Sequence, residues 1–131
     1  HMPYYVVECL KEILKEKKKT LSKAKLLVVG VTYKKDVKDL RKSPSLKLIE
    51  ILKEKRCQVN YFDPIIPFLN IGKIDMKSIK LTPNAIAKHD CVLIATDHTK
   101  VNYKLILKHA RMIYDLRNVY GHLKHKKIRK I

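Results

Sequence analysis

The chain has 131 residues, of which 46% are hydrophobic, so its length and composition suit one globular domain with a single core. Its 30 Lys and Arg residues outnumber its 12 Asp and Glu residues, and the formal net charge of +18 predicts affinity for anionic ligands or acidic partners. No apolar run approaches the roughly 20 residues of a membrane span, and no secretory signal is visible, so we expect no membrane-spanning segment. No C-x-x-C pair is present, which disfavours a disulfide framework or a cysteine metal site.

The N-terminal segment predicts a helix. His1 and Met2 are typical of a cloning remnant. In residues 3–22 the apolar side chains recur at helical spacing and form a stripe that consists of Val6, Val7, Leu10, Ile13 and Leu14. Because this stripe is large for a free arm, we interpret residues 3–22 as the end of a connecting region that packs on another domain or on a second copy of the chain.

A strand, a basic loop and a helix follow in residues 25–52. The apolar run at 26–31 predicts a strand that is buried on both faces. Ser43 is a plausible N-cap and Pro44 suits the first helical position. The loop between them therefore gathers cations at the carboxyl end of a buried strand and beside a helix N-terminus, which is where ligands bind in open α/β sheets. A solvated charged loop is the alternative interpretation.

Only Gly30 lies in this strand-to-helix turn, and the whole chain has three glycines. The Gly-x-Gly-x-x-Gly fingerprint of dinucleotide binding is missing, and so is the Walker-type Gly-x-x-x-x-Gly-Lys-Ser/Thr. If an anion binds here, Lys and Arg side chains must supply much of the positive charge.

The remaining segments alternate between strand and helix patterns. Further strands are predicted at 59–62, 79–81, 91–95 and 112–114, and short helices at 83–88 and 102–110. Residues 65–76 are expected to form a loop and residues 123–131 a frayed basic tail. The cysteines Cys9, Cys57 and Cys91 are expected to be buried reduced thiols of a cytoplasmic protein.

This alternation predicts an α/β fold: a Rossmann-like parallel sheet at 23–122 with helices on both faces, preceded by the N-terminal helix. Polar residues follow each long strand, and the carboxyl ends of parallel strands share one edge of the sheet. We therefore expect one binding crevice surrounded by the residues at these ends, although strand ends are polar in any case because they meet solvent. These residues are Tyr33, Lys34, Asp63, Asp97, His98, Asp115 and Arg117.

Several spaced motifs together resemble one known family. They are GVTYKKDVKDLRKSP at 30–44, YFDP at 61–64, ATDH at 95–98 and DLRN at 115–118. In this order they resemble the C-terminal domain of the UDP-glucose/GDP-mannose dehydrogenase family, with a leaning towards UDP-N-acetylhexosamine 6-dehydrogenases. The likeness covers about residues 2–121. It implies a Rossmann-like domain that holds the nucleotide end of a UDP-sugar while the enzyme oxidises the sugar C6 hydroxyl to a carboxylate with NAD.

The resemblance also implies roles for individual residues. Tyr33 and Lys34 match an aromatic–lysine pair that contacts the nucleotide sugar, and Arg117 matches an arginine that contacts the same substrate. Arg41 matches an arginine that reaches the NAD held by the preceding domain, and the alternative for Arg41 is a structural ion pair with Asp39 or Asp36. Lys42 departs from the family pattern, which has Glu at this position.

Other matching positions carry no assigned role: Lys35, Asp63, Asp97 and His98. His98 is expected to be a hydrogen-bonded loop histidine. No catalytic residue and no metal site is expected in the chain, because the glycine-rich NAD site and the nucleophilic cysteine of the family lie in upstream domains.

We therefore interpret the chain as the substrate-binding domain of a cytoplasmic enzyme of polysaccharide biosynthesis, inactive alone. Its expected partners are the UDP-sugar, the N-terminal NAD-binding and central domains of the same enzyme, and further copies in a homo-oligomer. The alternative is a basic module that binds polyanions or nucleic acid through the tail at 124–130. A purely structural or oligomerisation role, based on the apolar stripe of the first helix, is a third possibility.

Overall fold

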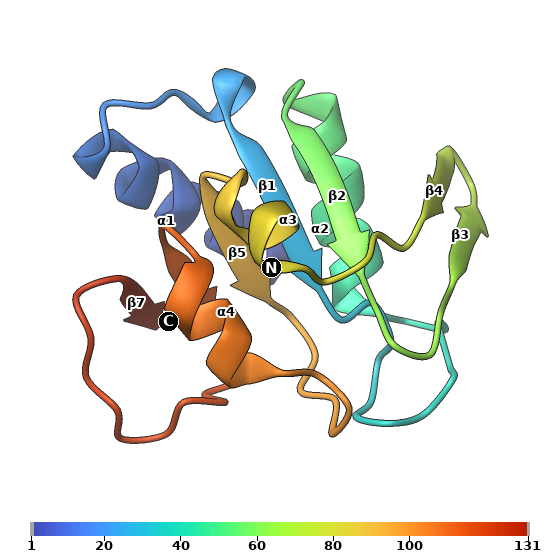
Figure 1. Cartoon of the computed structure of the whole chain (residues 1–131). Coiled ribbons are helices and arrows are strands. Elements are labelled where there is room, and N and C mark those ends of the chain that lie inside the picture. The colour runs from blue at the N-terminus through green and yellow to red at the C-terminus, as the bar shows by residue number, and fades with distance from the viewer. Residues whose placement is uncertain (1, 131) are drawn as a thin grey trace.

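The computed structural model describes residues 2–130, so His1, half of the expected cloning remnant, lies outside the described residues. The main sheet has five strands in the order β2-β1-β5-β6-β7, and all neighbouring strands are parallel (Figure 1). Its strands are β1 (Lys25–Val29), β2 (Gln58–Phe62), β5 (Cys91–Ile94), β6 (Ile113–Asp115) and β7 (Ile128–Lys130). The predicted α/β class with a parallel sheet is confirmed.

Helices cover both faces of this sheet (Figure 1). On one face lie α1 (Met2–Glu16) and α2 (Pro44–Glu54), and on the other lie α3 (Pro83–Ala87) and α4 (Tyr103–His109). Alternate residues of β1 divide the core between the faces, since Leu26 and Val28 pack towards α1 and α2 whereas Leu27 and Val29 pack towards α3 and α4. The apolar run at 26–31 therefore contains a strand that is buried on both faces, as predicted.

The turn after β1 requires glycine. Gly30 has φ +89°, and a Cβ at this position would lie 2.5 Å from the Cβ of Thr96 in the loop after β5. Thirteen residues after Gly30, Ser43 precedes α2 as predicted, but its hydroxyl does not cap the helix. It donates instead to the carbonyl of Val31 at 2.7 Å and so ties the start of α2 to the end of the β1 segment.

The apolar stripe of α1 is buried inside this chain. All of its members are less than a tenth exposed, namely Val6, Val7, Leu10, Ile13 and Leu14. They pack in the same cluster as Leu48 and Leu52 of α2 and Leu26 and Val28 of β1. The expectation that the stripe needs another domain or a second copy was wrong, because the helix folds back onto its own sheet. It ends at Glu16, before the short 3₁₀ helix η1 (Leu21–Lys23).

Two local predictions between β2 and α3 were also wrong. The expected loop at 65–76 contains an antiparallel hairpin of β3 (Phe68–Ile71) and β4 (Ile74–Lys77), with Gly72 at φ +57° in the turn. The expected strand at 79–81 is irregular, although Ile79 N donates to Tyr61 O of β2 at 2.9 Å. The two short helices that follow are confirmed. Each begins at a capping side chain, since Thr82 Oγ1 accepts from Ala85 N and Asn102 Oδ1 accepts from Leu105 N.

The basic C-terminal segment is folded, which corrects the expectation of a frayed tail. Strand β7 pairs with β6, and Ile128 is buried in the core beneath α4. Lys127 Nζ donates to the carbonyls of Leu107 and Ala110 at 2.5 and 2.9 Å at the end of α4. Arg129 pairs with Glu16 of α1. Over the described part of the tail, cations therefore hold the end of the chain against the domain.

Candidate functional site

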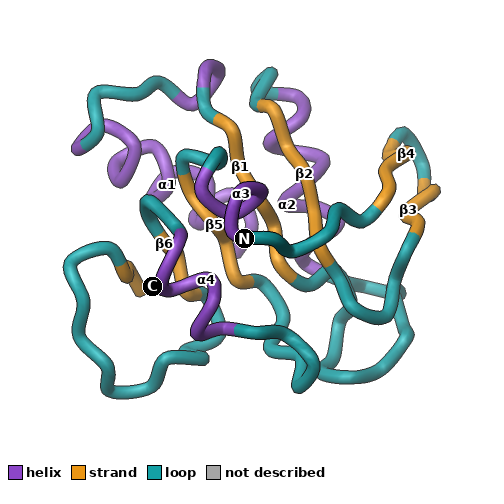
Figure 2. The backbone as a smooth tube through the Cα atoms, in the orientation of Figure 1, coloured by secondary structure: helices purple, strands orange, loops and turns teal. Residues whose placement is uncertain are grey.

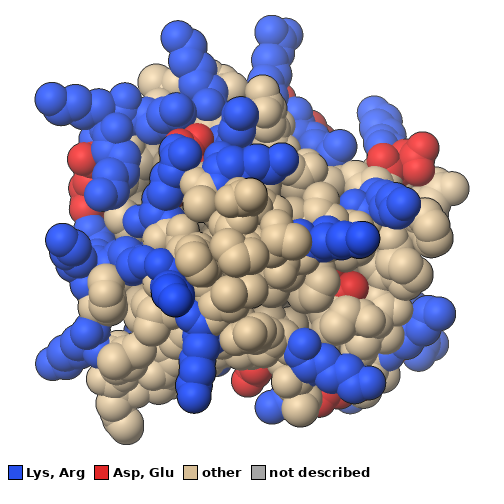
Figure 3. Space-filling view, in the orientation of Figure 1, with Lys and Arg blue, Asp and Glu red and all other residues tan. Residues whose placement is uncertain are grey.

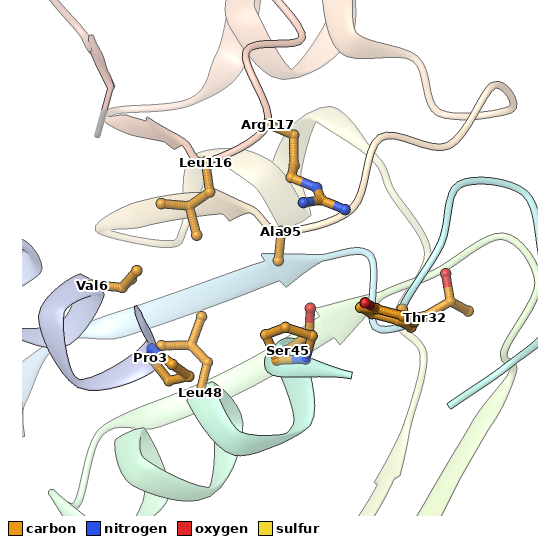
Figure 4. Close-up of a pocket in the computed structure, with 10 residues that line it drawn as sticks. Pro3, Val6, Thr32, Ser45, Leu48, Ala95, Leu116 and Arg117 are labelled. Carbon is orange, nitrogen blue, oxygen red and sulfur yellow. The ribbon is translucent and has the colours of Figure 1, made fainter. Parts of the chain in front are cut away.

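A cavity of about 110 Å³ opens at the carboxyl edge of the sheet, on the face that α1 and α2 cover (Figure 4). Its walls come from the first turns of α1 and α2 and from the segments that follow β1, β5 and β6. The lining residues are Pro3, Val6, Thr32, Tyr33, Pro44, Ser45, Leu48, Ala95, Leu116 and Arg117. Most of these side chains are apolar, and Arg117 brings the positive charge.

The sheet topology explains why a cavity forms here. From β1 the chain passes through α2 to β2 on one side, and it then returns through α3 to β5 on the other side of β1. The segments that leave β1 and β5 therefore diverge, and such a switch point is where open α/β sheets bind ligands. The first turn of α2 adds Pro44 and Ser45 to the wall, and a helix N-terminus carries partial positive charge.

Two of the predicted site residues meet at this cavity. Tyr33 comes from the loop after β1 and is 44% exposed, and Arg117 comes from the turn after β6. The guanidinium of Arg117 extends over Ala95 towards the loop that contains Thr32 (Figure 4). The buried carboxylate of Asp115 fixes this turn, because it accepts hydrogen bonds from the backbone N–H groups of Arg117, Val119 and Tyr120 at 3.1–3.2 Å.

The other two predicted site residues do not line the cavity. Lys34 follows Tyr33 and is exposed beside it. Arg41 lies further along the loop with 89% of its side chain exposed, and it forms a two-pronged ion pair with Asp39 at 3.1 and 3.2 Å. The hydrogen bonds from Arg41 hold the pKa of the Asp39 carboxyl below its ordinary value. For Arg41 the structure thus shows the ion-pair alternative that the sequence left open.

The remaining polar residues at this edge do not surround the crevice as expected. Asp63 is buried and accepts from the backbone N–H groups of Val31, Ile65 and Ile66 at 2.8, 2.8 and 3.2 Å. His98 is fully buried beside it, with Nε2 3.0 Å from Asp63 Oδ2, which confirms a hydrogen-bonded loop histidine. Asp97 forms an exposed pair with Lys35 at 3.7 Å. These residues fix the loops that carry the cavity wall.

Sequence reasoning missed several members of this loop network. Asp36 has φ +57°, and its carboxylate accepts from the backbone N–H of Thr99 at 2.8 Å and from the Thr99 hydroxyl. These bonds hold the pKa of Asp36 below its ordinary value. Thr96 Oγ1 donates to the carbonyl of Thr32 at 2.7 Å. The partners lie more than 60 residues apart in the chain, so no motif spacing could have paired them.

The turn after β1 does not offer a dinucleotide cradle. The space that a pyrophosphate would need above Gly30 is filled by Thr96. The acidic residue at the end of β2, which binds ribose in dinucleotide-binding folds, is Asp63, and its oxygens already accept backbone and histidine hydrogen bonds. The described residues therefore do not fit NAD in the manner of a Rossmann site.

Metal and thiol chemistry find no support in the described part of the chain. Between residues 2 and 130, no cluster of three or more His, Cys, Asp or Glu side chains is placed to hold a metal ion. All three cysteines are free; Cys57 and Cys91 are buried, and Cys9 is partly exposed, which departs from the expectation of three buried thiols. Burial raises the pKa of Cys91 to about 12 and raises that of Cys57, so both are poor nucleophiles.

The large positive charge is spread over the surface. Lys and Arg side chains lie around the whole of the visible face, with a few Asp and Glu side chains among them (Figure 3). Residues 128–130 form a strand, and Lys127 and Arg129 have intramolecular partners. The described part of the tail is therefore not the free basic arm that the polyanion interpretation invoked beside the net charge. Across residues 2–130, no helix combines the length and the apolar character that crossing a membrane requires.

Comparison with known sequences finds a family model and several relatives that match this chain. The family model described as "UDP-glucose/GDP-mannose dehydrogenase family, UDP binding domain" matches residues 27–122. A UDP-N-acetyl-D-mannosamine dehydrogenase from Methanococcus vannielii is 33% identical in an alignment that covers 92% of this chain and 28% of the relative. A UDP-glucose 6-dehydrogenase from Rickettsia prowazekii is 34% identical in an alignment that covers 79% of this chain and 26% of the relative. The chain thus spans little more than a quarter of these relatives.

Comparison with solved structures agrees. The structure of UDP-D-ManNAc dehydrogenase from Pyrococcus horikoshii superposes with a TM-score of 0.78 and 28% identity, over 99% of this chain and 30% of that chain. A GDP-mannose dehydrogenase from Pseudomonas aeruginosa superposes with a TM-score of 0.66 at 18% identity, which shows a shared fold. Nothing in these comparisons supports the nucleic-acid interpretation.

Proposed function

Because the chain belongs to the UDP-glucose/GDP-mannose dehydrogenase family, we propose that it binds the nucleotide end of a UDP-sugar in the cavity beneath Arg117. The observation that carries this proposal is the meeting of Tyr33, Arg117 and the first turn of α2 at one cavity inside the matched region. An arginine fork and a helix N-terminus suit a diphosphate. The apolar walls from Val6, Leu48 and Leu116 suit a base and a ribose.

Each predicted contact has a role that fits its position. Arg117 reaches into the cavity and can give two parallel hydrogen bonds to a phosphate or a ribose. Tyr33 offers an exposed ring at the opposite wall for the nucleoside. Lys34 stands outside the lining, so its ammonium acts as a point charge at the rim.

The proposed enzyme oxidises the sugar C6 hydroxyl to a carboxylate with NAD, and other parts of the enzyme supply the chemistry. The match covers about 28% of the relatives, so we place the NAD site and the reacting groups in the portion that this chain does not span. Within it, residues 23–122 are the nucleotide-sugar domain and residues 3–22 the end of the connecting region. Arg41, which points outwards, is the one residue proposed to reach NAD, and to do so it must exchange its partner Asp39.

In the cell, the proposed enzyme is a cytoplasmic homo-oligomer that supplies a sugar acid for polysaccharide biosynthesis. The names of the relatives support the substrate class, since several are dehydrogenases of UDP-N-acetyl-D-mannosamine or UDP-glucose by name. They favour an N-acetylhexosamine as the sugar.

Calorimetric titration of the 131-residue chain with UDP and with the UDP-sugar tests the proposal. Loss of a hydrogen bond to a charged group costs about 1.5–3 kcal/mol. Arg117→Ala should therefore weaken binding by about 10- to 150-fold at roughly 1.4 kcal/mol per decade, and Lys34→Ala should weaken it less because this side chain lies at the rim. Arg41→Ala should leave UDP binding unchanged and, in the complete enzyme, raise the apparent KM for NAD.

Arg111→Ala is the matched control. Arg111 precedes β6 at the opposite edge of the sheet, where it pairs with Asp90 at 3.5 Å, so its loss removes the same charge far from the cavity. No binding by the wild-type chain at millimolar nucleotide, or equal weakening by Arg111→Ala and Arg117→Ala, would refute the proposed site.

A further inference from the structure

The loop after β1 carries the proposed substrate contacts but has little structure of its own. Within residues 32–39 the backbone makes few internal bonds, for instance Tyr33 N to Asp39 O at 3.0 Å and Asp39 N to Val37 O at 2.9 Å. Most of these side chains are exposed. The loop lies beside the segment that follows β5 (Figure 2), and bonds from that segment hold it in place.

His98 is the centre of these bonds. Its ring is fully buried, and both nitrogens have partners. Nδ1 lies 2.9 Å from the backbone nitrogen of Asp36, and Nε2 lies 3.0 Å from Asp63 Oδ2 and 3.2 Å from Thr32 Oγ1. The backbone N–H of His98 donates to the hydroxyl of Tyr103 at 2.9 Å. This bond fixes His98 to the first residue of α4.

The partners decide where the ring proton resides. A backbone N–H can only donate, so Nδ1 of His98 must accept from Asp36 and carries no proton. The proton is then on Nε2, which donates to the carboxylate of Asp63. The hydroxyl of Thr32 donates to the carbonyl of Lys34 at 2.8 Å and therefore faces Nε2 with a lone pair.

These hydrogen bonds hold both ends of the segment that carries the proposed substrate contacts. Thr32 and Asp36 immediately flank the three residues Tyr33, Lys34 and Lys35, and the imidazole contacts both of them. Asp63 does not depend on His98 in the same way, because three backbone N–H groups already satisfy its carboxylate. Loss of the imidazole should therefore affect the conformation of the loop that carries Tyr33 more than the position of Asp63.

We propose that His98 is a positioning residue, which holds Tyr33 and Lys34 in their binding conformation through the acceptor Nδ1. This inference rests on the proposed function, in which these two residues contact the nucleotide sugar. Without the acceptor, the N–H of Asp36 loses its partner and the loop populates other conformations. The affinity for nucleotide then falls in proportion to the fraction of molecules whose loop is competent.

Two substitutions separate the nitrogens of the ring. His98→Asn keeps an acceptor oxygen at the position of Nδ1 and loses the donor to Asp63, whereas His98→Gln keeps a donor at the position of Nε2 and loses the acceptor for Asp36. Calorimetry with the UDP-sugar should show His98→Asn within about threefold of wild type and His98→Gln weaker by about tenfold, the cost of one lost neutral hydrogen bond plus the disordered loop. A purely structural role through Asp63 predicts the opposite order.

His89→Gln is the matched control, because His89 is equally buried but bonds to Asn60 and Ala85 on the far side of the sheet. It should lower stability and leave nucleotide affinity unchanged. Equal affinity of all His98 variants, or tighter binding by His98→Gln than by His98→Asn, overturns the positioning role. A wild-type chain that binds no nucleotide overturns the proposed function itself, so the two failures are distinct.

The tautomer can be measured on the wild-type protein, independently of whether any variant folds. The ¹⁵N chemical shifts of His98 should report an unprotonated Nδ1 and a protonated Nε2 in the ligand-free chain. Amide exchange at Asp36 should be slow in wild type and in His98→Asn, and faster in His98→Gln. A proton found on Nδ1 contradicts the proposal, since the N–H of Asp36 then has no acceptor.

Discussion

At the scale of single residues, buried polar groups in this protein carry specific hydrogen bonds. His89 shows this on the face opposite the cavity. Its Nδ1 donates to the carbonyl of Ala85 at 2.6 Å, and its Nε2 accepts from the side chain of Asn60 at 3.0 Å, so α3 is fixed to β2. Burial lowers the pKa of His89, because the charged imidazolium would lose its water, and the bond to Ala85 and the charge of Asp90 offset this loss only in part.

The stability of the fold should therefore fall in acid partly through His89. Its pKa is lower in the folded than in the unfolded chain, so its contribution is fully present above the unfolded pKa of about 6.5 and is lost as the pH falls below it, by at most about 1.4 kcal/mol per pH unit. Urea unfolding at pH 7.5 and 5.5 should show a smaller loss for His89→Gln than for wild type. Identical losses in both proteins would show that His89 does not titrate during folding.

The sequence predicted the position of two of the site residues, while their binding roles stay predictions. Tyr33 and Arg117 were placed at one edge by the strand pattern, and the cavity joins them. The predicted role of the Ser43 side chain as an N-cap was wrong, because its hydroxyl donates to the buried carbonyl of Val31 and does not accept from an N–H group of the first turn of α2. The hydrogen-bond partners of Asp36 and His98 could not be foreseen, since loop–loop hydrogen bonds depend on backbone positions that side-chain patterns do not encode.

At the scale of elements, the strands and helices that the sequence identified have a strong local signal. Strands β1 and β5 are uninterrupted apolar runs, and α3 and α4 begin at capping side chains. The hairpin β3–β4 and strand β7 lack such signals: each strand has three or four residues, β3 is interrupted by Asn70, and β4 and β7 contain charged residues. Strand β7 forms because β6 presents an unpaired edge and Ile128 fills the core beside it. Both the free edge and the core position of Ile128 arise from the tertiary structure, so local periodicity cannot predict this strand.

Strand β7 should contribute measurably to stability. Ile128 is 9% exposed and packs in the core on the side of α4, so Ile128→Ala should lower the free energy of unfolding by about 2 kcal/mol. Leu123, in the same segment, is 46% exposed, and Leu123→Ala should change it by less than about 0.5 kcal/mol. Chemical denaturation of both variants distinguishes the two cases. Equal, negligible effects would mean that the segment is the frayed tail that composition suggests.

At the scale of the whole molecule, helices close the sheet on both faces. Helix α1 covers part of the sheet that its own chain provides, so the apolar stripe is not free to recruit a second copy. The net charge of +18 surrounds the cavity with positive potential, which attracts a nucleotide diphosphate from a distance but does not choose its site. The choice comes from Arg117, Tyr33 and the start of α2, which lie together at the carboxyl edge.

The most direct test of this account is to locate bound UDP on the ¹⁵N-labelled chain by NMR titration. Shifts should concentrate in the backbone amides of Thr32, Tyr33, Ser45, Ala95 and Arg117, and inorganic pyrophosphate should perturb a subset of them. If UDP instead perturbs the lysine-rich segment at 123–130, or shifts charged positions uniformly over the surface, charge alone governs binding and the assignment of the cavity is wrong.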